Sequence, residues 1–136
     1  MKIWGRRKGE QPVSWKITRS CLSLIFESAK EIYPREFAAL LRVYPERRDT
    51  ISEIMLLPGT ISGDAHAIFM LHMRPIDFSI VGTVHSHPST SWYPSEADLH
   101  LFRKYGRIHL IVAYPFKEDT WGAYDYRGNP IEVKVI

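Results

Sequence analysis

The sequence is short of cysteine, of long apolar runs and of excess charge, and each shortage excludes a class of protein. A lone Cys21 can form neither an intramolecular disulfide nor a multi-cysteine zinc site, so we expect it in the core of a helix as a small hydrophobe. No apolar run approaches the ~20 residues of a membrane span, and the opening MKIWGRRKGEQPV lacks the apolar region of a secretory signal. These absences predict a cytoplasmic protein that has no membrane partner.

The charge balance is nearly neutral. The chain has 18 basic and 15 acidic residues, so its net charge is 18 − 15 = +3. The basic residues form only short groups, at Arg6-Arg7-Lys8, Arg47-Arg48 and Arg103-Lys104. Because no aromatic-interleaved basic motif accompanies them, nucleic acid is not an expected partner.

Length and composition are those of a globular domain. The 136 residues, 45% of them hydrophobic and 24% charged, predict one domain over residues 1–136. Residues 1–16 are a candidate irregular extension of that domain. Nothing in the composition predicts an oligomeric state.

Hydrophobic periodicity predicts an α/β fold of the α+β type, with a mixed, largely antiparallel sheet flanked by helices. Apolar residues recur at helical spacing after Thr18, and Pro34 ends that segment. The helices are expected at 18–33 and 95–105, and the strands at 37–44, 51–57, 65–73, 78–87, 108–114, 121–126 and 131–135. A charged turn, Glu46-Arg47-Arg48-Asp49, is expected to join the first two strands.

The stretch HSHPSTSWYPSEAD, residues 85–98, combines two patterns at one junction between a strand and a helix. Residues two apart in a strand point to the same face, so His85 and His87 would project side by side. Asp98 would lie in the first turn of the next helix, where Ser95-x-x-Asp98 is also a capping box. Nitrogen and oxygen donors of this kind suit zinc, and three protein ligands leave a fourth position for water.

Each half of this stretch also has a purely structural interpretation. Histidines in strands are often hydrogen-bonded without a metal, and Ser-x-x-Asp is commoner as a helix cap than as part of a catalytic site. The co-occurrence of both halves at one junction favours a metal site. The remaining histidines are expected to be structural or on the surface; they are His66, His72, His100 and His109.

HSHPSTSWYPSEAD resembles, position for position, the JAMM (MPN-plus) metalloprotease signature His-x-His, seven residues, Ser-x-x-Asp. The fold of that family is similar to that of the cytidine deaminases and agrees with the element order expected from about Thr18 onward. The resemblance implies that His85, His87 and Asp98 bind one Zn²⁺ per chain. It also implies that Ser95 stabilises the oxyanion formed during amide hydrolysis.

A general base is still needed, and the sequence offers five upstream glutamates, which are Glu27, Glu31, Glu36, Glu46 and Glu53. Spacing does not choose among them. Glu36 stands out because it precedes the apolar run FAALLRVY, where an unpaired carboxylate would be costly. The family places its glutamate there, since PREFAALL, residues 34–41, is similar to Pro-x-Glu-x-x-Gly-Leu-Leu. Ala39 replaces the glycine of that pattern, which puts the local backbone geometry in question.

The resemblance implies an isopeptidase that cleaves after the C-terminal Gly of a ubiquitin-like protein linked to lysine, as in prokaryotic, particularly archaeal, members acting on small modifier proteins. Trp92 and Tyr93 are candidates to pack on an extended Gly-Gly tail, or else they bury their own loop. Two alternatives stay open: a peptidase that trims a sulfur-carrier C-terminus, and a non-catalytic MPN scaffold. A deaminase is excluded because Pro-Cys-x-x-Cys is absent, and a Ser-His-Asp hydrolase because Ser95 has no nucleophile-elbow context.

Overall fold

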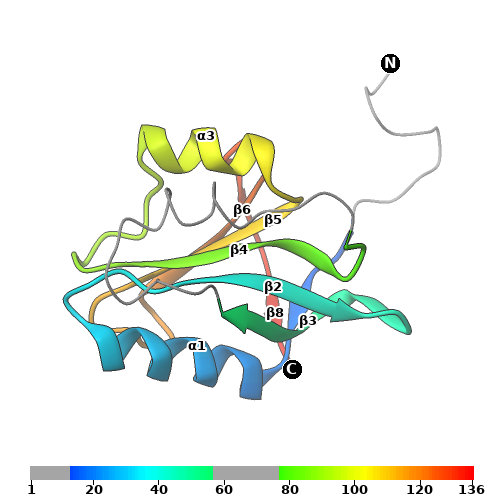
Figure 1. Ribbon diagram of the computed structural model, residues 1–136, viewed down its shortest axis with the longest axis horizontal. Coiled ribbons are helices and arrows are strands. Elements are labelled where there is room, and N and C mark those ends of the chain that lie inside the picture. Colours follow the sequence, from blue (N-terminus) through cyan, green and yellow to red (C-terminus); the bar gives the residue numbers. More distant parts are fainter. Residues whose placement is uncertain (1–12, 57–76) are drawn as a thin grey trace.

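The computed structural model describes residues 13–56 and 77–136, which form one eight-stranded sheet between two helices (Figure 1). The strand expected at 65–73, with His66 and His72, lies outside the described residues. The elements in chain order are β1 (Lys16–Ile17), α1 (Arg19–Ile32), β2 (Ala38–Tyr44), β3 (Arg47–Leu56), β4 (Ile80–His87), α3 (Glu96–Lys104), β5 (Ile108–Ala113), β6 (Trp121–Asp125), β7 (Pro130–Ile131) and β8 (Lys134–Val135).

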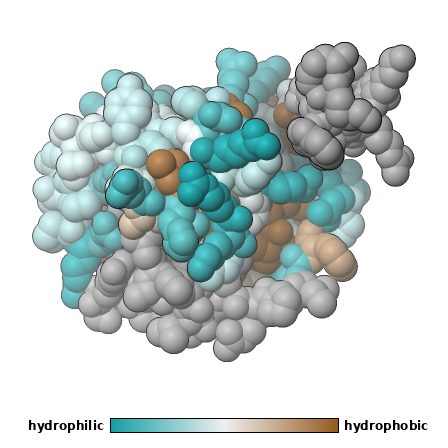
Figure 2. All heavy atoms as spheres, turned by 90° about the horizontal axis from the view of Figure 1, so that it is seen from above, coloured by the Kyte–Doolittle hydropathy of each residue, from teal (hydrophilic) through white to brown (hydrophobic). Residues whose placement is uncertain are grey.

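The two helices lie on opposite faces of the sheet (Figure 1). The α1 face carries the larger apolar cluster, to which β2 contributes Ala39, Leu41 and Val43. The alternate β2 residues, Ala38 and Leu40, join the smaller cluster under α3. Because both faces of β2 are covered, its sequence is a continuous apolar run rather than an alternating one. Seen from the α3 side, the described surface is mainly hydrophilic, with hydrophobic residues in small separate patches (Figure 2).

The sheet order is β7-β6-β5-β4-β2-β3-β1-β8, and the sheet is mixed, as expected. β4 lies at its centre, antiparallel to β2 and parallel to β5. Parallel neighbours need a crossover connection, and α3 forms it between β4 and β5. The loop of residues 88–95 therefore leaves the end of β4 at His87 and leads directly into α3.

Two predictions about the strands were wrong in detail. The β2–β3 turn is Pro45-Glu46 alone, because Arg47 already pairs with Tyr44. The expected strand 131–135 is two strands, since β7 pairs with β6 and β8 with β1. As only residues 132 and 133 separate them, the two edges of the sheet lie close together and the sheet curls.

The sequence prediction also placed the start of the folded domain too late, because it assigned residues up to 16 to an irregular extension. Residues 1–12 lie outside the described residues, but Trp15 is buried in the main core cluster and Lys16 belongs to β1. Thr18 caps α1 as predicted, by accepting a hydrogen bond from the backbone N–H of Cys21. Cys21 is buried, as expected, and burial together with the charge of Glu53 raises the pKa of its thiol to about 12. Neither described helix is long and apolar enough to cross a membrane.

Candidate metal centre

β4 places both histidines of the His-x-His pair on the face covered by α3. His85 is fully buried, and the side chain of His87 is 16% exposed. Their ring centroids are 5.1 Å apart, as expected for residues two apart on one strand. The imidazoles therefore form a pair at the end of β4, where the 88–95 loop begins.

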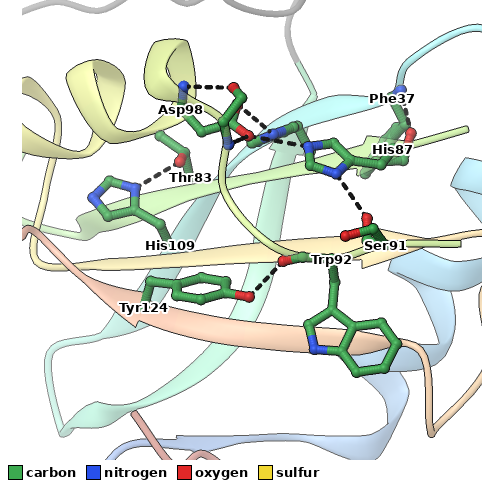
Figure 3. A network of polar contacts seen from close by, with 11 residues as sticks. Phe37, Thr83, His87, Ser91, Trp92, Asp98, His109 and Tyr124 are labelled. Carbon is green, nitrogen blue, oxygen red and sulfur yellow. Dashed lines mark hydrogen bonds and ion pairs between the residues drawn. The ribbon is translucent and has the colours of Figure 1, made fainter. Parts of the chain in front are cut away.

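Asp98 of α3 completes the cluster from a different element (Figure 3). One carboxylate oxygen lies 3.0 Å from Nε2 of His85, and the other lies 3.1 Å from Nε2 of His87. One donor atom from each side chain lies within 4.8 Å of the other two, which is about twice the usual zinc–ligand distance of about 2.0–2.2 Å. Among the described residues this is the one group of three such donors, and it fits one zinc ion.

The same carboxylate also caps its own helix. Oδ2 of Asp98 accepts a hydrogen bond from the backbone N–H of Ser95 at 2.9 Å, and Oγ of Ser95 accepts from the backbone N–H of Asp98 at 3.1 Å. These are the two bonds of a capping box. The cap and the metal cluster are therefore compatible, because the cap fixes the carboxylate while both of its oxygens face the imidazoles.

A backbone carbonyl sets the orientation of the His87 ring. Nδ1 of His87 lies 2.9 Å from the carbonyl oxygen of Ser91, which can only accept, so Nδ1 is the donor (Figure 3). In a neutral imidazole this leaves the Nε2 lone pair directed at the cluster, as a metal ligand requires. Burial lowers the pKa of His87, but contacts with Asp98 and Ser91 and the charge of Glu36 outweigh it, and the net shift is upward.

The two predicted catalytic residues lie beside this cluster. Ser95 is exposed and lies directly before α3. Glu36 is half-buried just before β2, two residues from Ala38, the partner of His85 in the β2–β4 ladder. Its charge acts on His87. The catalytic roles of both residues stay predictions.

Ala39 causes no distortion where the family pattern has glycine. It is fully buried and pairs regularly with Leu56 of β3 and Val84 of β4. A strand residue with extended backbone angles does not need glycine, so the geometry at this position is ordinary.

Trp92 and Tyr93 have different surroundings. The indole of Trp92 lies against Gly122, where an added Cβ would come within 2.6 Å of the ring. The carbonyl of Trp92 accepts a hydrogen bond from the hydroxyl of Tyr124 (Figure 3). Trp92 thus packs its loop on β6, whereas Tyr93 is 73% exposed. Their contacts with a substrate stay predictions.

Sequence reasoning missed a buried polar network behind the cluster. Nδ1 of His109 lies 2.7 Å from the hydroxyl of Thr83 (Figure 3). Its Nε2 lies 3.3 Å from the carbonyl of Gly106, and the ring stacks on Phe102. Burial lowers the pKa of His109 to about 4. His109 is therefore structural and His100 is exposed, as predicted for both.

A mixed sheet between two helices, with two strand histidines and a capping aspartate around one zinc position, defines a JAMM-type zinc site of the metalloprotease class. Residues 18–125 match the family of prokaryotic homologs of the JAB domain. The chain belongs to this family, a branch of the JAMM (MPN-plus) proteins.

Known relatives agree with this assignment. A curated protein of Haloferax volcanii, described as a probable metalloprotease, is 33% identical over 127 residues, which cover 88% of this chain and 78% of that protein. A solved structure described as the JAMM metalloprotease-like zinc site of the proteasome and signalosome is 38% identical, with a TM-score of 0.71 over 90% of this chain and 98% of that chain. A JAB1/MPN domain protein from Archaeoglobus fulgidus is also 38% identical, with a TM-score of 0.70 over 92% and 99%. The chain is a metalloprotease of this type.

Proposed function

We propose that the protein is a cytoplasmic zinc-dependent isopeptidase that hydrolyses the amide bond between the C-terminal Gly of a ubiquitin-like modifier and a lysine. The observation that carries the proposal is the buried carboxylate of Asp98, whose two oxygens lie 3.0 and 3.1 Å from two imidazoles of one strand. Zinc held there supplies Lewis-acid chemistry, which polarises a carbonyl and lowers the pKa of a water molecule.

Ser95 is suited to stabilise the oxyanion because its role as a helix cap leaves its hydrogen available. Its Oγ accepts the bond from the backbone N–H of Asp98, which uses an oxygen lone pair. The O–H can still donate, and the residue is exposed. A substrate carbonyl that gains negative charge would therefore meet a hydrogen-bond donor held by the start of α3.

Glu36 is suited to move the proton. Its carboxylate is half-buried and its charge acts on His87, so it lies within electrostatic reach of the cluster. In hydrolysis it takes a proton from the attacking water and passes it to the lysine nitrogen as the carbon–nitrogen bond breaks. The products are a free modifier carboxylate and a free amine.

The test is a cleavage assay on ubiquitin-like proteins, supplied both as lysine-linked conjugates and as linear fusions. We expect the zinc-loaded chain to cleave the lysine-linked conjugates, and Glu36→Gln to be slower by about 10²-fold or more while it keeps its zinc. Glu31→Gln, an exposed carboxylate on α1, is the matched control and should retain parental rates.

Other results would decide between the alternatives. Cleavage of linear fusions alone would show that the chain trims carrier C-termini instead. If the zinc-loaded chain cleaves no substrate, the domain is a scaffold and the proposal fails. If Glu36→Gln is as fast as a parent that does cleave, Glu36 is not the general base and the proposed mechanism fails.

A further inference from the structure

Ser86, which separates the two histidines, is a polar residue in an apolar environment. It is 1% exposed, and strand alternation directs it to the face opposite His85 and His87. A buried hydroxyl without a partner costs about 1–3 kcal/mol. Its hydrogen bond is therefore informative about why a serine stands at this position.

The hydroxyl of Ser86 binds the peptide group that links Glu36 to Phe37. The N–H between Glu36 and Phe37 donates to Oγ of Ser86 at 2.8 Å, in a buried contact. The N–H of Ser86 donates in return to the carbonyl of Phe37 at 2.9 Å. In a regular antiparallel ladder the Phe37 N–H would bind the carbonyl of Ser86, so here the side chain has taken the place of the main chain.

Burial and strand pairing hold the residues that follow Glu36 in place. Phe37 is 3% exposed and packs in the main core cluster, and the next ladder pair joins Ala38 to the ligand His85. Glu36 itself is half-buried and precedes the strand. The peptide on its C-terminal side is thus tied to the residue between the two zinc ligands.

We propose that Ser86 is a positioning residue that sets the carboxylate of Glu36 relative to the zinc ligands; this rests on the proposed function. β4 carries the two histidines, and through the Ser86 hydroxyl it also holds the peptide group that follows the proposed base, Glu36. A displacement of about 1 Å at a catalytic group can cost about 10²-fold in rate, so this single bond affects turnover.

Ser86→Ala removes the hydroxyl but leaves the histidines and Asp98 in place. We expect kcat to fall about 10- to 100-fold with KM nearly unchanged, zinc content to stay at the parental level, and the Phe37 amide to exchange faster with solvent. Ser86→Thr keeps a hydroxyl and should restore most of kcat. Thr83→Val removes another buried hydroxyl from β4 and is the control for general loss of stability.

A second readout measures position without catalysis. In the cobalt-substituted protein, paramagnetic shifts of the Glu36 side chain report its place relative to the metal, and Ser86→Ala should change them while Thr83→Val does not. If the parent cleaves nothing but the shifts change, the positioning role stands and the proposed function fails. If Ser86→Ala leaves both the Glu36 shifts and kcat at parental values, or if Thr83→Val changes them equally, Ser86 has no positioning role.

Discussion

At the scale of single residues, burial and partners decide what each polar side chain does. Asp98 is 1% exposed, and its carboxylate serves both the helix cap and the cluster with His85 and His87. His109 is equally buried, yet its partners are Thr83 and the Gly106 carbonyl, and it holds no place in the cluster. His85 and His109 are both fully buried, yet they have different roles because their neighbours differ.

His109 makes the stability of the fold depend on pH. Burial lowers its pKa to about 4, whereas an unfolded histidine titrates near 6.5. Between these values the unfolded chain binds a proton that the folded chain does not, so stability falls as the pH drops from 6.5 towards 4. From this residue alone, we expect the free energy of unfolding to be about 2 kcal/mol lower at pH 5 than at pH 7.

Urea unfolding of the metal-free protein at the two pH values measures this difference, with His109→Gln as the comparison. The variant keeps a polar side chain of similar size that does not titrate. Its pH 7 to pH 5 difference should be smaller than the parental one by the stated amount. Equal differences in the two proteins would show that His109 does not carry the effect.

At the scale of elements, one residue at the start of α3, Ser95, contributes both to the stability of the helix and to the proposed catalysis. The helix begins after Ser95 because that serine and Asp98 satisfy each other's backbone N–H groups. Ser95→Ala removes both a cap and the proposed oxyanion donor, so it should lower the free energy of unfolding by about 1 kcal/mol and kcat by about 10²-fold or more.

Ser95→Gly separates these two effects. Glycine at an N-cap costs only a few tenths of a kcal/mol relative to serine, but it has no hydroxyl. Chemical denaturation and steady-state kinetics should therefore show a nearly parental stability with the same loss of kcat as in Ser95→Ala. Parental kcat in the glycine variant would exclude Ser95 from the reaction.

The sequence predicted elements whose signals are local. Both described helices carry their own caps, and HSHPSTSWYPSEAD contains three ligands and the cap within one stretch. Elements that exist through distant pairing were missed or merged. β1 was not predicted and β8 was joined to β7 in one strand, because β1 and β8 have two residues each and are defined by each other and by β3. The bond from Phe37 to Ser86 spans 49 positions, and no local pattern fixes that register.

At the scale of the whole molecule, the cluster joins the centre of the sheet to the helix that crosses over it. Zinc bound by His87 and its partners stabilises the folded chain, since the unfolded chain does not hold the three donors together. At free zinc about 1,000 times the Kd, the gain is about 4 kcal/mol. Thermal unfolding with and without zinc should show this gain in the parent and in His100→Ala, but not in His87→Ala.

His100→Ala is the matched control because that histidine is exposed on α3 and lies outside the cluster. An equal zinc-induced rise of Tm in His87→Ala and in the parent would mean that zinc binds elsewhere.

The metal content of the purified and zinc-reconstituted chain shows whether His85, His87 and Asp98 hold one zinc ion. Elemental analysis should give about one zinc per chain for the parent and for His100→Ala, and far less than one for His85→Ala and for Asp98→Ala. Stoichiometric zinc in both of the latter variants, or none in the parent, would show that these three residues do not hold the ion.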